Sequence, residues 1–384
     1  MVIATMRTTS LPPHWFYCDA PYFGGAETYL QWHLEAAGPQ RLGLIALDRP
    51  TLSPWLLQLE RDGFAVRRLR EHSWRARWTE LYRELEGLAP EMVHFNFPHP
   101  YDGIFGLAPL AAKWAKVERI VVTEHLPGVG KVGKRYWAKR AGVRTVDTSI
   151  AVCEAHRSIL IDTFHYSPAR VVTVLNGVPD TNPEGIIWAE REAPMPAELA
   201  ARERGGGPRI VQLGALDLRK GGDVLIEGLA RLARQGTRFQ MWFVGEGSDR
   251  PELERLICEA GLKERIHLAS HRNDVVTILR ACDLMVLASR REGMPLSLLE
   301  GICQGLPLVA TDVDGVKELL KHDENGLLVS PADPRALFFA LGELLADRAT
   351  RIRFGQAGRG RYEAHHTLER MTSSTFAVHR GERP

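Results

Sequence analysis

The interpretation of this chain starts from one stretch, which runs Arg291-Glu292-Gly293-Met294-Pro295-Leu296-Ser297-Leu298-Leu299-Glu300-Gly301. Pro295 suits the first position of a helix, because its fixed φ fits a helix start and its missing N–H would be unpaired there. We therefore expect Glu292 in the loop before a helix and Glu300 inside that helix. The other residues from 294 to 302 are apolar or small. A carboxylate on such an element is expected to need a hydrogen-bonding partner.

The helix N-terminus between the two glutamates comprises Gly293, Met294, Pro295 and Leu296. Free backbone N–H groups and the helix dipole favour an anion at this point. The order carboxylate, anion site, carboxylate suits a sugar, a diphosphate and a ribose bound end to end.

This arrangement resembles the E-x7-E motif of the retaining glycosyltransferases of family 4 (glycosyl transferases group 1), which have the GT-B fold. The resemblance implies an α/β protein with two tandem Rossmann-like, doubly wound domains that face each other across a cleft. It also implies a nucleotide-sugar donor on the second domain, most commonly a UDP-sugar, and an acceptor on the first. In such proteins the residue equivalent to Glu292 holds the sugar, and the one equivalent to Glu300 holds the ribose.

Length and composition agree with a two-domain enzyme. A chain of 384 residues is too long for one ordinary core, and 45% hydrophobic and 25% charged residues are typical of a globular protein. The net charge of +2 gives no indication of nucleic-acid binding. The five scattered cysteines show no zinc spacing and predict reduced thiols. We find no signal-peptide pattern and no apolar run of about 18 residues, so a cytoplasmic location is expected.

Short β-rich runs alternate with helical patterns along the chain, which predicts parallel sheets. Strands are expected over residues 14–18, 41–48, 92–97, 119–125, 148–154, 171–178, 209–216, 239–247, 265–271, 284–289 and 307–313. A Pro-, Gly- and Glu-rich stretch interrupts this rhythm and indicates a linker. We expect a first domain over 1–183, a linker over 184–207 and a second domain over 208–359, with a C-terminal helix in 360–384 that rejoins the first domain.

The segment from Gly214 to Gly222 follows a predicted strand and precedes a predicted helix, with Arg219 and Lys220 at the helix entrance. It resembles the family pattern G-R-L-x-x-x-K-G, in which the lysine grips the donor diphosphate. Lys220 matches that lysine, whereas Ala215 stands where the family has arginine. Our hypothesis is that Arg219 supplies the missing charge. The alternative is a basic helix start that faces solvent.

Two further loops match donor-side loops of the family. Gly245 lies in Gly-Glu-Gly after a strand, and Arg272 begins the segment that follows the next strand. A tight turn explains the glycines equally well. The chain has no Gly-x-Gly-x-x-Gly in this region, so a dinucleotide fingerprint is not indicated.

Asp312-Val313-Asp314 resembles the metal-binding Asp-x-Asp of the other glycosyltransferase fold, GT-A. Two carboxylates can bind a hard cation. However, the pair lies where family 4 has a small residue and a glycine before Gly-Val-x-Glu, and Gly315 continues that pattern. We therefore interpret it as a strand-to-helix turn and expect no metal and no cofactor.

In the first domain, Gly24 and Gly25 resemble the family's Gly-Gly-Ala-Glu loop, which closes over the donor phosphate. His125 ends a predicted strand and matches the family's active-site histidine, although a structural histidine would also fit that position. Three polar residues before it, His94, Asn96 and His99, either line the acceptor side or form an ordinary strand end.

Two basic stretches contain interleaved tryptophans. The first basic stretch, residues 67–78, contains Arg67, Arg68, Arg70, Trp74, Arg75, Arg77 and Trp78, and the second basic stretch, residues 131–140, contains Lys131, Lys134, Arg135, Tyr136, Trp137, Lys139 and Arg140. Such segments suit an anionic membrane surface or an anionic acceptor. A solvated face is the alternative.

Together these patterns predict a metal-independent, retaining glycosyltransferase that moves a sugar to the hydroxyl of a sugar, glycolipid or small molecule, with His125 and Glu292 at the reacting centre. Two alternatives stay open at this point: a nucleotide-sugar 2-epimerase of the same fold, and a non-catalytic nucleotide-sugar-binding protein. The sequence does not name the sugar, the nucleotide, the acceptor or the oligomeric state.

Overall fold

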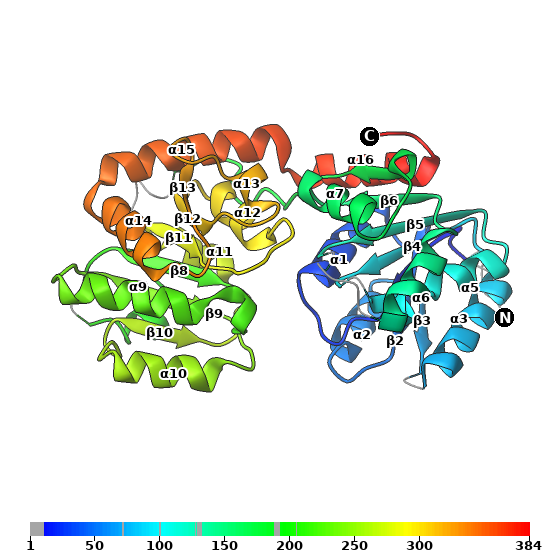
Figure 1. Cartoon of the computed structure of the whole chain (residues 1–384), viewed down its shortest axis with the longest axis horizontal. Coiled ribbons are helices and arrows are strands. Elements are labelled where there is room, and N and C mark those ends of the chain that lie inside the picture. Colours follow the sequence, from blue (N-terminus) through cyan, green and yellow to red (C-terminus); the bar gives the residue numbers. More distant parts are fainter. Residues whose placement is uncertain are drawn as a thin grey trace, which may run out of the picture. The chain divides into compact units, whose positions relative to one another are not determined.

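The computed structural model describes residues 11–70, 73–99, 101–126, 128, 133–187, 193–204 and 206–384 (Figure 1). The chain divides into two compact units. Unit 1 comprises Met1–Val174 and Thr372–Pro384, and unit 2 comprises Leu175–Met371. Each unit contains one parallel sheet covered by helices, which confirms two Rossmann-like domains.

The seven strands of the unit 1 sheet lie in the order β3-β2-β1-β4-β5-β6-β7. They are β1 His14–Cys18, β2 Leu42–Leu47, β3 Val66–Leu69, β4 Met92–Phe97, β5 Arg119–Glu124, β6 Thr148–Ala151 and β7 Val171–Thr173. The helices are α1 Gly25–Ala37, α2 Ser53–Arg61, α3 Trp74–Leu88, α4 Asp102–Gly106, α5 Ala108–Trp114, α6 Gly133–Val143, α7 Glu154–Asp162 and α16 Leu368–Arg380. Successive side chains of β1 enter different cores, Trp15 and Tyr17 on one face and Phe16 and Cys18 on the other. This strand is therefore buried on both faces, as expected in a parallel sheet.

The six strands of the unit 2 sheet lie in the order β10-β9-β8-β11-β12-β13. They are β8 Arg209–Leu213, β9 Gln240–Val244, β10 Ile266–Ala269, β11 Leu284–Leu287, β12 Leu308–Thr311 and β13 Gly326–Val329. The helices are α8 Ala197–Ala200, α9 Gly222–Arg234, α10 Arg250–Glu259, α11 Val275–Arg280, α12 Leu296–Cys303, α13 Val316–Leu319, α14 Pro334–Ala346 and α15 Arg348–His365.

Each sheet has one point at which the strand order reverses. In unit 1 this switch point lies between β1 and β4, and in unit 2 it lies between β8 and β11. The loops that leave two neighbouring strands at a switch point go to opposite faces, so a crevice opens between them at the carboxyl ends of the strands. Ligand-binding residues are therefore expected in the loops after β1, β4, β8 and β11.

The expected strands omitted two real ones, β3 and β13. Both are four-residue strands at a sheet edge, and edge strands are commonly short and charged. Pro295 is the N-cap of α12 rather than its first helical residue, because its ψ of 119° is still extended. The expected C-terminal helix is divided into α15 and α16, since the helical hydrogen bonding stops at His366.

The units also divide at positions that differ from the expected 183 and 360. Residues 175–183 belong to unit 2, where Asn176 donates to the Met294 carbonyl at 2.9 Å and Arg359 pairs with Asp180 at 2.8 Å. The α15 helix stays there as well, because glycines such as Gly355 allow it to lie close to the end of α12. Composition alone gave no sign of these contacts.

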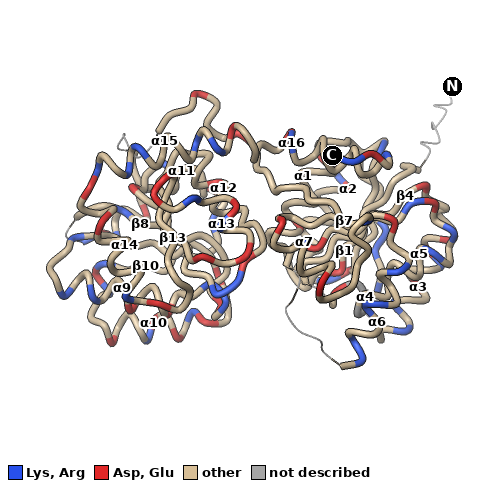
Figure 2. The backbone as a smooth tube through the Cα atoms, turned by 45° about the horizontal axis from the view of Figure 1, so that its top comes forward, with Lys and Arg blue, Asp and Glu red and all other residues tan. Residues whose placement is uncertain are grey.

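Acidic and basic residues are interspersed along both units (Figure 2). All five cysteines lie within the described residues, and none of them forms a disulfide. Among the described helices, none has the length and apolarity needed to cross a membrane.

Candidate functional site

Three charged side chains meet at the switch point of unit 2. Lys220 and Arg219 lie in the loop after β8, and Glu292 lies in the loop after β11. The Lys220 Nζ donates to Glu292 Oε1 at 2.6 Å, and the Arg219 Nη1 donates to the same oxygen at 3.3 Å. Ser289 Oγ donates to it at 2.7 Å. The structure therefore joins two segments that are about 70 residues apart in sequence into one charged cluster.

Backbone geometry explains why the two loops come so close. Gly221 has a φ of 66°, and a Cβ there would lie 2.0 Å from the Ala288 carbonyl oxygen. Only glycine fits that left-handed conformation at that distance. Asp217 accepts the Lys220 backbone N–H at 3.1 Å, which forms the short turn before α9. The Arg290 N–H donates to the Arg219 carbonyl at 2.7 Å, so the loops are also held by the main chain.

Glu292 is 5% exposed but is charged. Burial by itself would raise its pKa, but the Lys220 and Arg219 cations and the hydrogen bonds from Lys220 and Ser289 outweigh it and lower the pKa. Removing either cation from a buried carboxylate is costly, because the remaining charge is not compensated. Glu292 holds Lys220 and Arg219 in place beside the start of α12.

Glu300 lies one turn into α12 and has a different environment. Burial raises its pKa to about 7, and the described part of the chain supplies no charge that opposes this effect. A hydrogen bond from Asn176 to the Met294 carbonyl holds the segment just before the helix. The glutamates at the two ends of the motif therefore differ: Glu292 is satisfied by the protein, and Glu300 is not. A ligand that donates hydrogen bonds would complete the environment of Glu300.

Gly245 and Arg272, the other residues predicted on the donor side, lie in different surroundings. Gly245 has a φ of 147° and a Cβ there would lie 2.1 Å from the Gly214 carbonyl oxygen, so glycine is required where these loops meet. Ala215 is half-buried beside them. Arg272 donates to both oxygens of Asp274, at 2.8 and 2.7 Å, and pairs with Glu198. These carboxylates, rather than the Glu292 cluster, are the partners of Arg272.

The Asp312–Asp314 pair forms a turn, as expected. Asp314 has a φ of 35°, in the left-handed region that favours glycine. Its pKa is raised mainly by burial, and its carboxylate accepts the Glu292 backbone N–H. Asp312 pairs with Lys317 at 3.6 Å. Within the described residues, no group of three or more His, Cys, Asp or Glu side chains is arranged to hold a metal ion.

In unit 1, His125 lies at the end of β5 and its Nε2 is 2.7 Å from Asn96 Oδ1. Burial and neighbouring histidines lower its pKa to about 3, so the ring is neutral at physiological pH. Asn96 also donates to the Ala26 carbonyl at 3.0 Å, which links His125 to the start of α1. Gly24 caps that helix, and its N–H donates to Glu27 at 2.9 Å. Gly25 is the first residue of the helix.

The other polar residues of β4 are separated by the fold. His94 is fully buried and contacts Thr123 and His379, each at 2.8 Å, so it belongs to the core. His99 is exposed at the strand end. Of the three residues named as acceptor-side candidates, only Asn96 and His99 stand near the carboxyl end of the strand.

Several residues of the two basic stretches are exposed, among them Arg67, Arg75 and Lys134, but two basic side chains are paired with carboxylates. Lys139 is 1% exposed and donates to Glu124 Oε1 at 2.6 Å, within reach of the Phe97 ring. Arg68 pairs with Glu60 at 2.9 Å. Lys131 lies outside the described residues.

Sequence reasoning missed several residues that complete these sites. Ser289 holds Glu292, Asn176 holds the Met294 segment, and Glu27 holds Gly24. Only Glu27 had a local signal, because a glutamate three residues after a helix N-cap is typical of a capping box. Ser289 lies only three residues before Glu292 but belongs to no recognisable motif, and Asn176 reaches Met294 across the fold.

Both units match known sequence families. Residues 199–361 match the profile described as Glycosyl transferases group 1, and residues 23–182 match that described as Glycosyltransferase Family 4. By fold and by sequence, the chain is related to the GT-B glycosyltransferases. Among solved structures, Alr3699/HepE of Anabaena, solved in complex with UDP, has a TM-score of 0.80 at 17% identity, over 96% of this chain and 99% of that chain. Sucrose-phosphate synthase of Thermosynechococcus elongatus gives 0.76 at 19%, over 96% and 98%.

Curated relatives of this GT-B chain have varied descriptions. The lipopolysaccharide core biosynthesis glycosyltransferase LpsE of Rhizobium meliloti is 29% identical over 44% of this chain and 48% of that protein. The alpha-D-kanosaminyltransferase of Streptomyces kanamyceticus is 29% identical over 57% and 56%. The D-inositol 3-phosphate glycosyltransferase of Xylanimonas cellulosilytica is 32% identical over 46% and 45%. The chain thus spans about half the length of the curated relatives that it matches.

Proposed function

We propose that this chain is a glycosyltransferase that takes a sugar from a nucleotide-sugar, most simply a UDP-sugar, and transfers it to an acceptor hydroxyl with retention of configuration. The observation that supports this most is the cluster of Lys220, Arg219 and Glu292 beside α12, with Glu300 further along the helix. Structures of the neighbour HepE contain UDP, or UDP-glucose. The proposal assigns an equivalent donor to unit 2.

The proposed roles follow from charge and position. Lys220 has three N–H donors and uses one on Glu292, so others are available for the diphosphate. As the bond to the sugar breaks, negative charge grows on the diphosphate, and Lys220, Arg219 and the N–H groups at the start of α12 stabilise it. These groups supply the positive charge for which other transferases use a metal, so the proposed reaction is metal-independent.

The carboxylates hold the two ends of the donor. Oε1 of Glu292 accepts from the cations and from Ser289, and the proposal assigns its Oε2 to the sugar hydroxyls. Glu300 accepts hydrogen bonds from the ribose diol. Neutral His125 positions the sugar or the acceptor, because a ring whose pKa is about 3 is not a proton donor at neutral pH. The departing diphosphate oxygen then helps to take the acceptor proton.

Incubation with UDP-glucose tests the assignment. We expect slow release of UDP without acceptor and, with acceptor, a glycoside whose anomeric configuration in proton NMR matches that of the donor. An inverted centre would contradict retention. A 2-epimer formed without acceptor would favour the epimerase, and UDP-glucose binding without any turnover would favour a binding protein.

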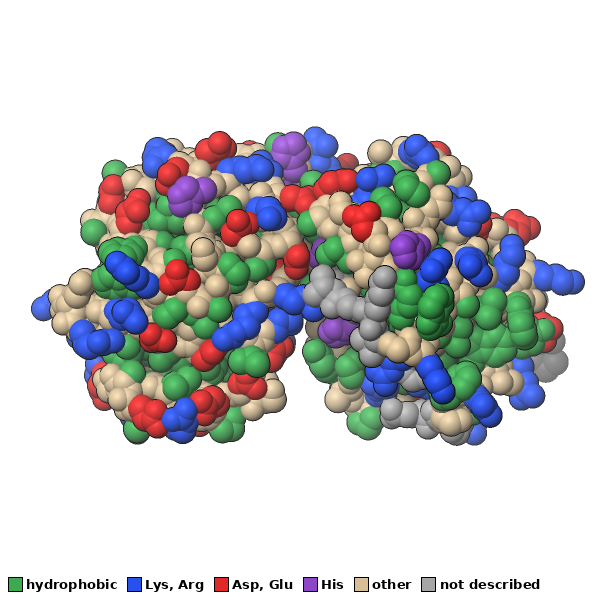
Figure 3. All heavy atoms as spheres, viewed as in Figure 1, with side chains coloured by type: hydrophobic (Ala, Val, Ile, Leu, Met, Phe, Trp, Pro, Cys, Tyr) green, Lys and Arg blue, Asp and Glu red, His purple; other side chains and the backbone are tan. Residues whose placement is uncertain are grey.

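We also infer a cytoplasmic enzyme whose unit 1 contacts an anionic membrane surface. Trp74 is 42% exposed and Trp137 is 65% exposed, each with an arginine beside its ring, Arg75 at 5.2 Å and Arg140 at 5.7 Å. Hydrophobic side chains also lie beside Lys and Arg on the face of unit 1 that Figure 3 presents. Aromatic rings with adjacent cations suit the interfacial region of a membrane.

A further inference from the structure

A pocket of about 390 Å³ lies at the carboxyl ends of the strands of unit 1. Asp19 follows β1, Arg49 follows β2 and His99 follows β4, so the pocket opens at the switch point of this sheet. The α4 helix contributes Asp102. Its volume lies within the roughly 300–1,000 Å³ that is usual for small-molecule sites. The proposed donor site uses none of these residues.

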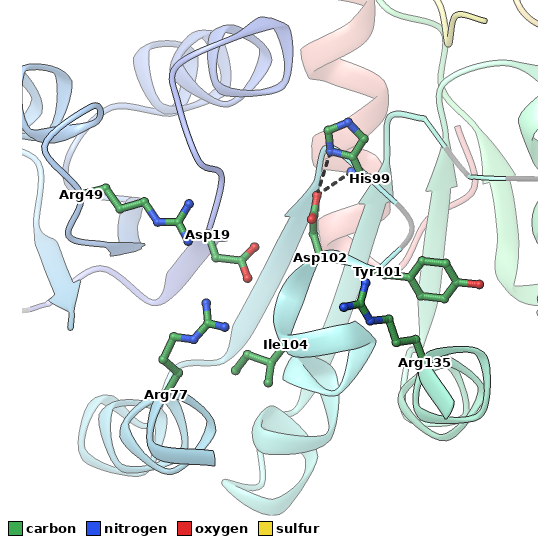
Figure 4. Close-up of a pocket in the computed structure, with 8 residues that line it drawn as sticks. All are labelled: Asp19, Arg49, Arg77, His99, Tyr101, Asp102, Ile104 and Arg135. Atoms are coloured by element: carbon green, nitrogen blue, oxygen red, sulfur yellow. Dashed lines mark hydrogen bonds and ion pairs between the residues drawn. The ribbon is translucent and has the colours of Figure 1, made fainter. Parts of the chain in front are cut away.

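Arginines dominate the charge of this pocket. Arg49 comes from the loop after β2, Arg77 from α3 and Arg135 from α6. Each of the two basic stretches thus sends one residue to the same pocket. Figure 4 shows the Arg77 and Arg135 guanidinium groups pointing toward the space between their helices, with Asp19 beside Arg49 and Arg77. Three guanidinium groups face two carboxylates.

The two carboxylates have protein partners. Asp102 accepts the His99 backbone N–H at 2.6 Å and lies 3.4 Å from the His99 ring. Asp19 is hydrogen-bonded to the Tyr17 side chain. By contrast, the Arg77 Nε is buried and has no hydrogen-bond partner in the part of the chain that the structure describes. A buried donor of this kind is costly unless a ligand satisfies it.

Guanidinium forks match the oxygen atoms of phosphate groups, and carboxylate and imidazole groups match sugar hydroxyls. An acceptor with hydroxyl groups and a phosphate would therefore use both halves of the pocket. A neutral sugar would add no negative charge to balance the third guanidinium group, and a bare phosphate would add no hydroxyl group to donate to Asp19 and Asp102.

We propose that this pocket is the acceptor subsite for a phosphorylated sugar or polyol, with Arg49, Arg77 and Arg135 around the phosphate and with Asp19 and Asp102 toward the hydroxyls. This assignment rests on the proposed function and narrows it, since it makes the acceptor an anion. The phosphate is a phosphomonoester, which a soluble sugar phosphate or a lipid head can carry.

Calorimetric titration of the full chain with glucose 6-phosphate, glucose and short-chain phosphatidic acid tests the subsite. We expect the phosphorylated probes to bind and glucose to be undetected at the same concentration. Arg77→Gln and Arg135→Gln should each weaken the binding by about tenfold or more, because each removes a charge-assisted contact. The probe whose affinity falls in both arginine variants shows whether the phosphate comes from a soluble sugar phosphate or from a lipid head.

Arg83→Gln on α3 and Lys134→Gln on α6 are matched controls, since both side chains are exposed and neither lines the pocket. They should leave the affinity unchanged. Equal losses in controls and pocket variants, or no binding of any phosphorylated probe by a protein that binds UDP, would overturn the subsite. If the parent protein does not bind UDP but binds glucose 6-phosphate in a way that depends on Arg77, the donor assignment alone would be overturned. Arg135 is exposed, so its variant stays informative if Arg77→Gln does not fold.

Discussion

Replacing Glu300 by glutamine should make unit 2 more stable and its donor binding weaker. Burial raises the pKa of Glu300 to about 7, compared with about 4.3 in an unfolded chain. Below pH 4.3 both states are protonated and the group costs nothing. Between pH 4.3 and 7 the unfolded state loses its proton and the folded state keeps it, so stability falls by about 1.4 kcal/mol per pH unit. Above pH 7 the cost is constant, at about 3.7 kcal/mol as an upper value.

Glutamine does not ionise, so Glu300→Gln should remove this cost. The variant and the parent should be nearly equal near pH 4.5, and the variant should gain up to about 3.7 kcal/mol at pH 8. Urea unfolding measures this gain. The transition that belongs to unit 2 is the one that UDP-glucose shifts to a higher urea concentration. The same variant should bind UDP-glucose less tightly, because losing a hydrogen bond to a charged group typically costs about 1.5–3 kcal/mol.

Glu343→Gln on α14 is the control, since Glu343 is exposed. It should change neither stability nor affinity. UDP-glucose is the better ligand for the pH series, because both of its phosphates are esterified and do not titrate near pH 7. A Glu300→Gln protein with parental stability at pH 8 would refute the burial argument. Parental affinity would refute the ribose role.

Four shorter predictions concern the other sites. Lys220→Ala should destabilise unit 2 by about 3 kcal/mol in urea at pH 8, because it leaves the Glu292 carboxylate buried with one cation fewer; the difference should shrink at acid pH, where Glu292 is protonated, and a pH-independent loss would contradict the ionic explanation. UDP release should persist in EDTA and in Asp312→Ala, whereas activity that requires added Mn²⁺ and is lost in this variant would favour the Asp-x-Asp hypothesis. Gly245→Ala should cost more than about 1 kcal/mol in thermal unfolding, since its φ of 147° and the nearby carbonyl exclude a Cβ; unchanged unfolding would show that the loop adjusts. Co-sedimentation with anionic vesicles should occur at low salt and weaken in Trp137→Ala, and absence of binding at low ionic strength would remove the membrane contact.

The sequence by itself determined much of the fold and one half of the candidate site in unit 2. Strand and helix periodicities depend on neighbouring residues, so they predicted two parallel α/β units, except for the short edge strands β3 and β13. The spacing of Glu292 and Glu300 predicted a loop carboxylate and a helical carboxylate for the same reason.

Only the tertiary structure decided how these residues are used. Lys220 and Glu292 are 72 residues apart, and their contact exists because β8 and β11 are neighbours at a switch point. The same logic brings Arg77 and Arg135 from two separate basic stretches to one pocket, while it buries Lys139 of the second stretch. Local pattern gives the kind of side chain and the element that carries it. Strand order, which depends on contacts across the whole sheet, decides which side chains meet and which of them reach a ligand.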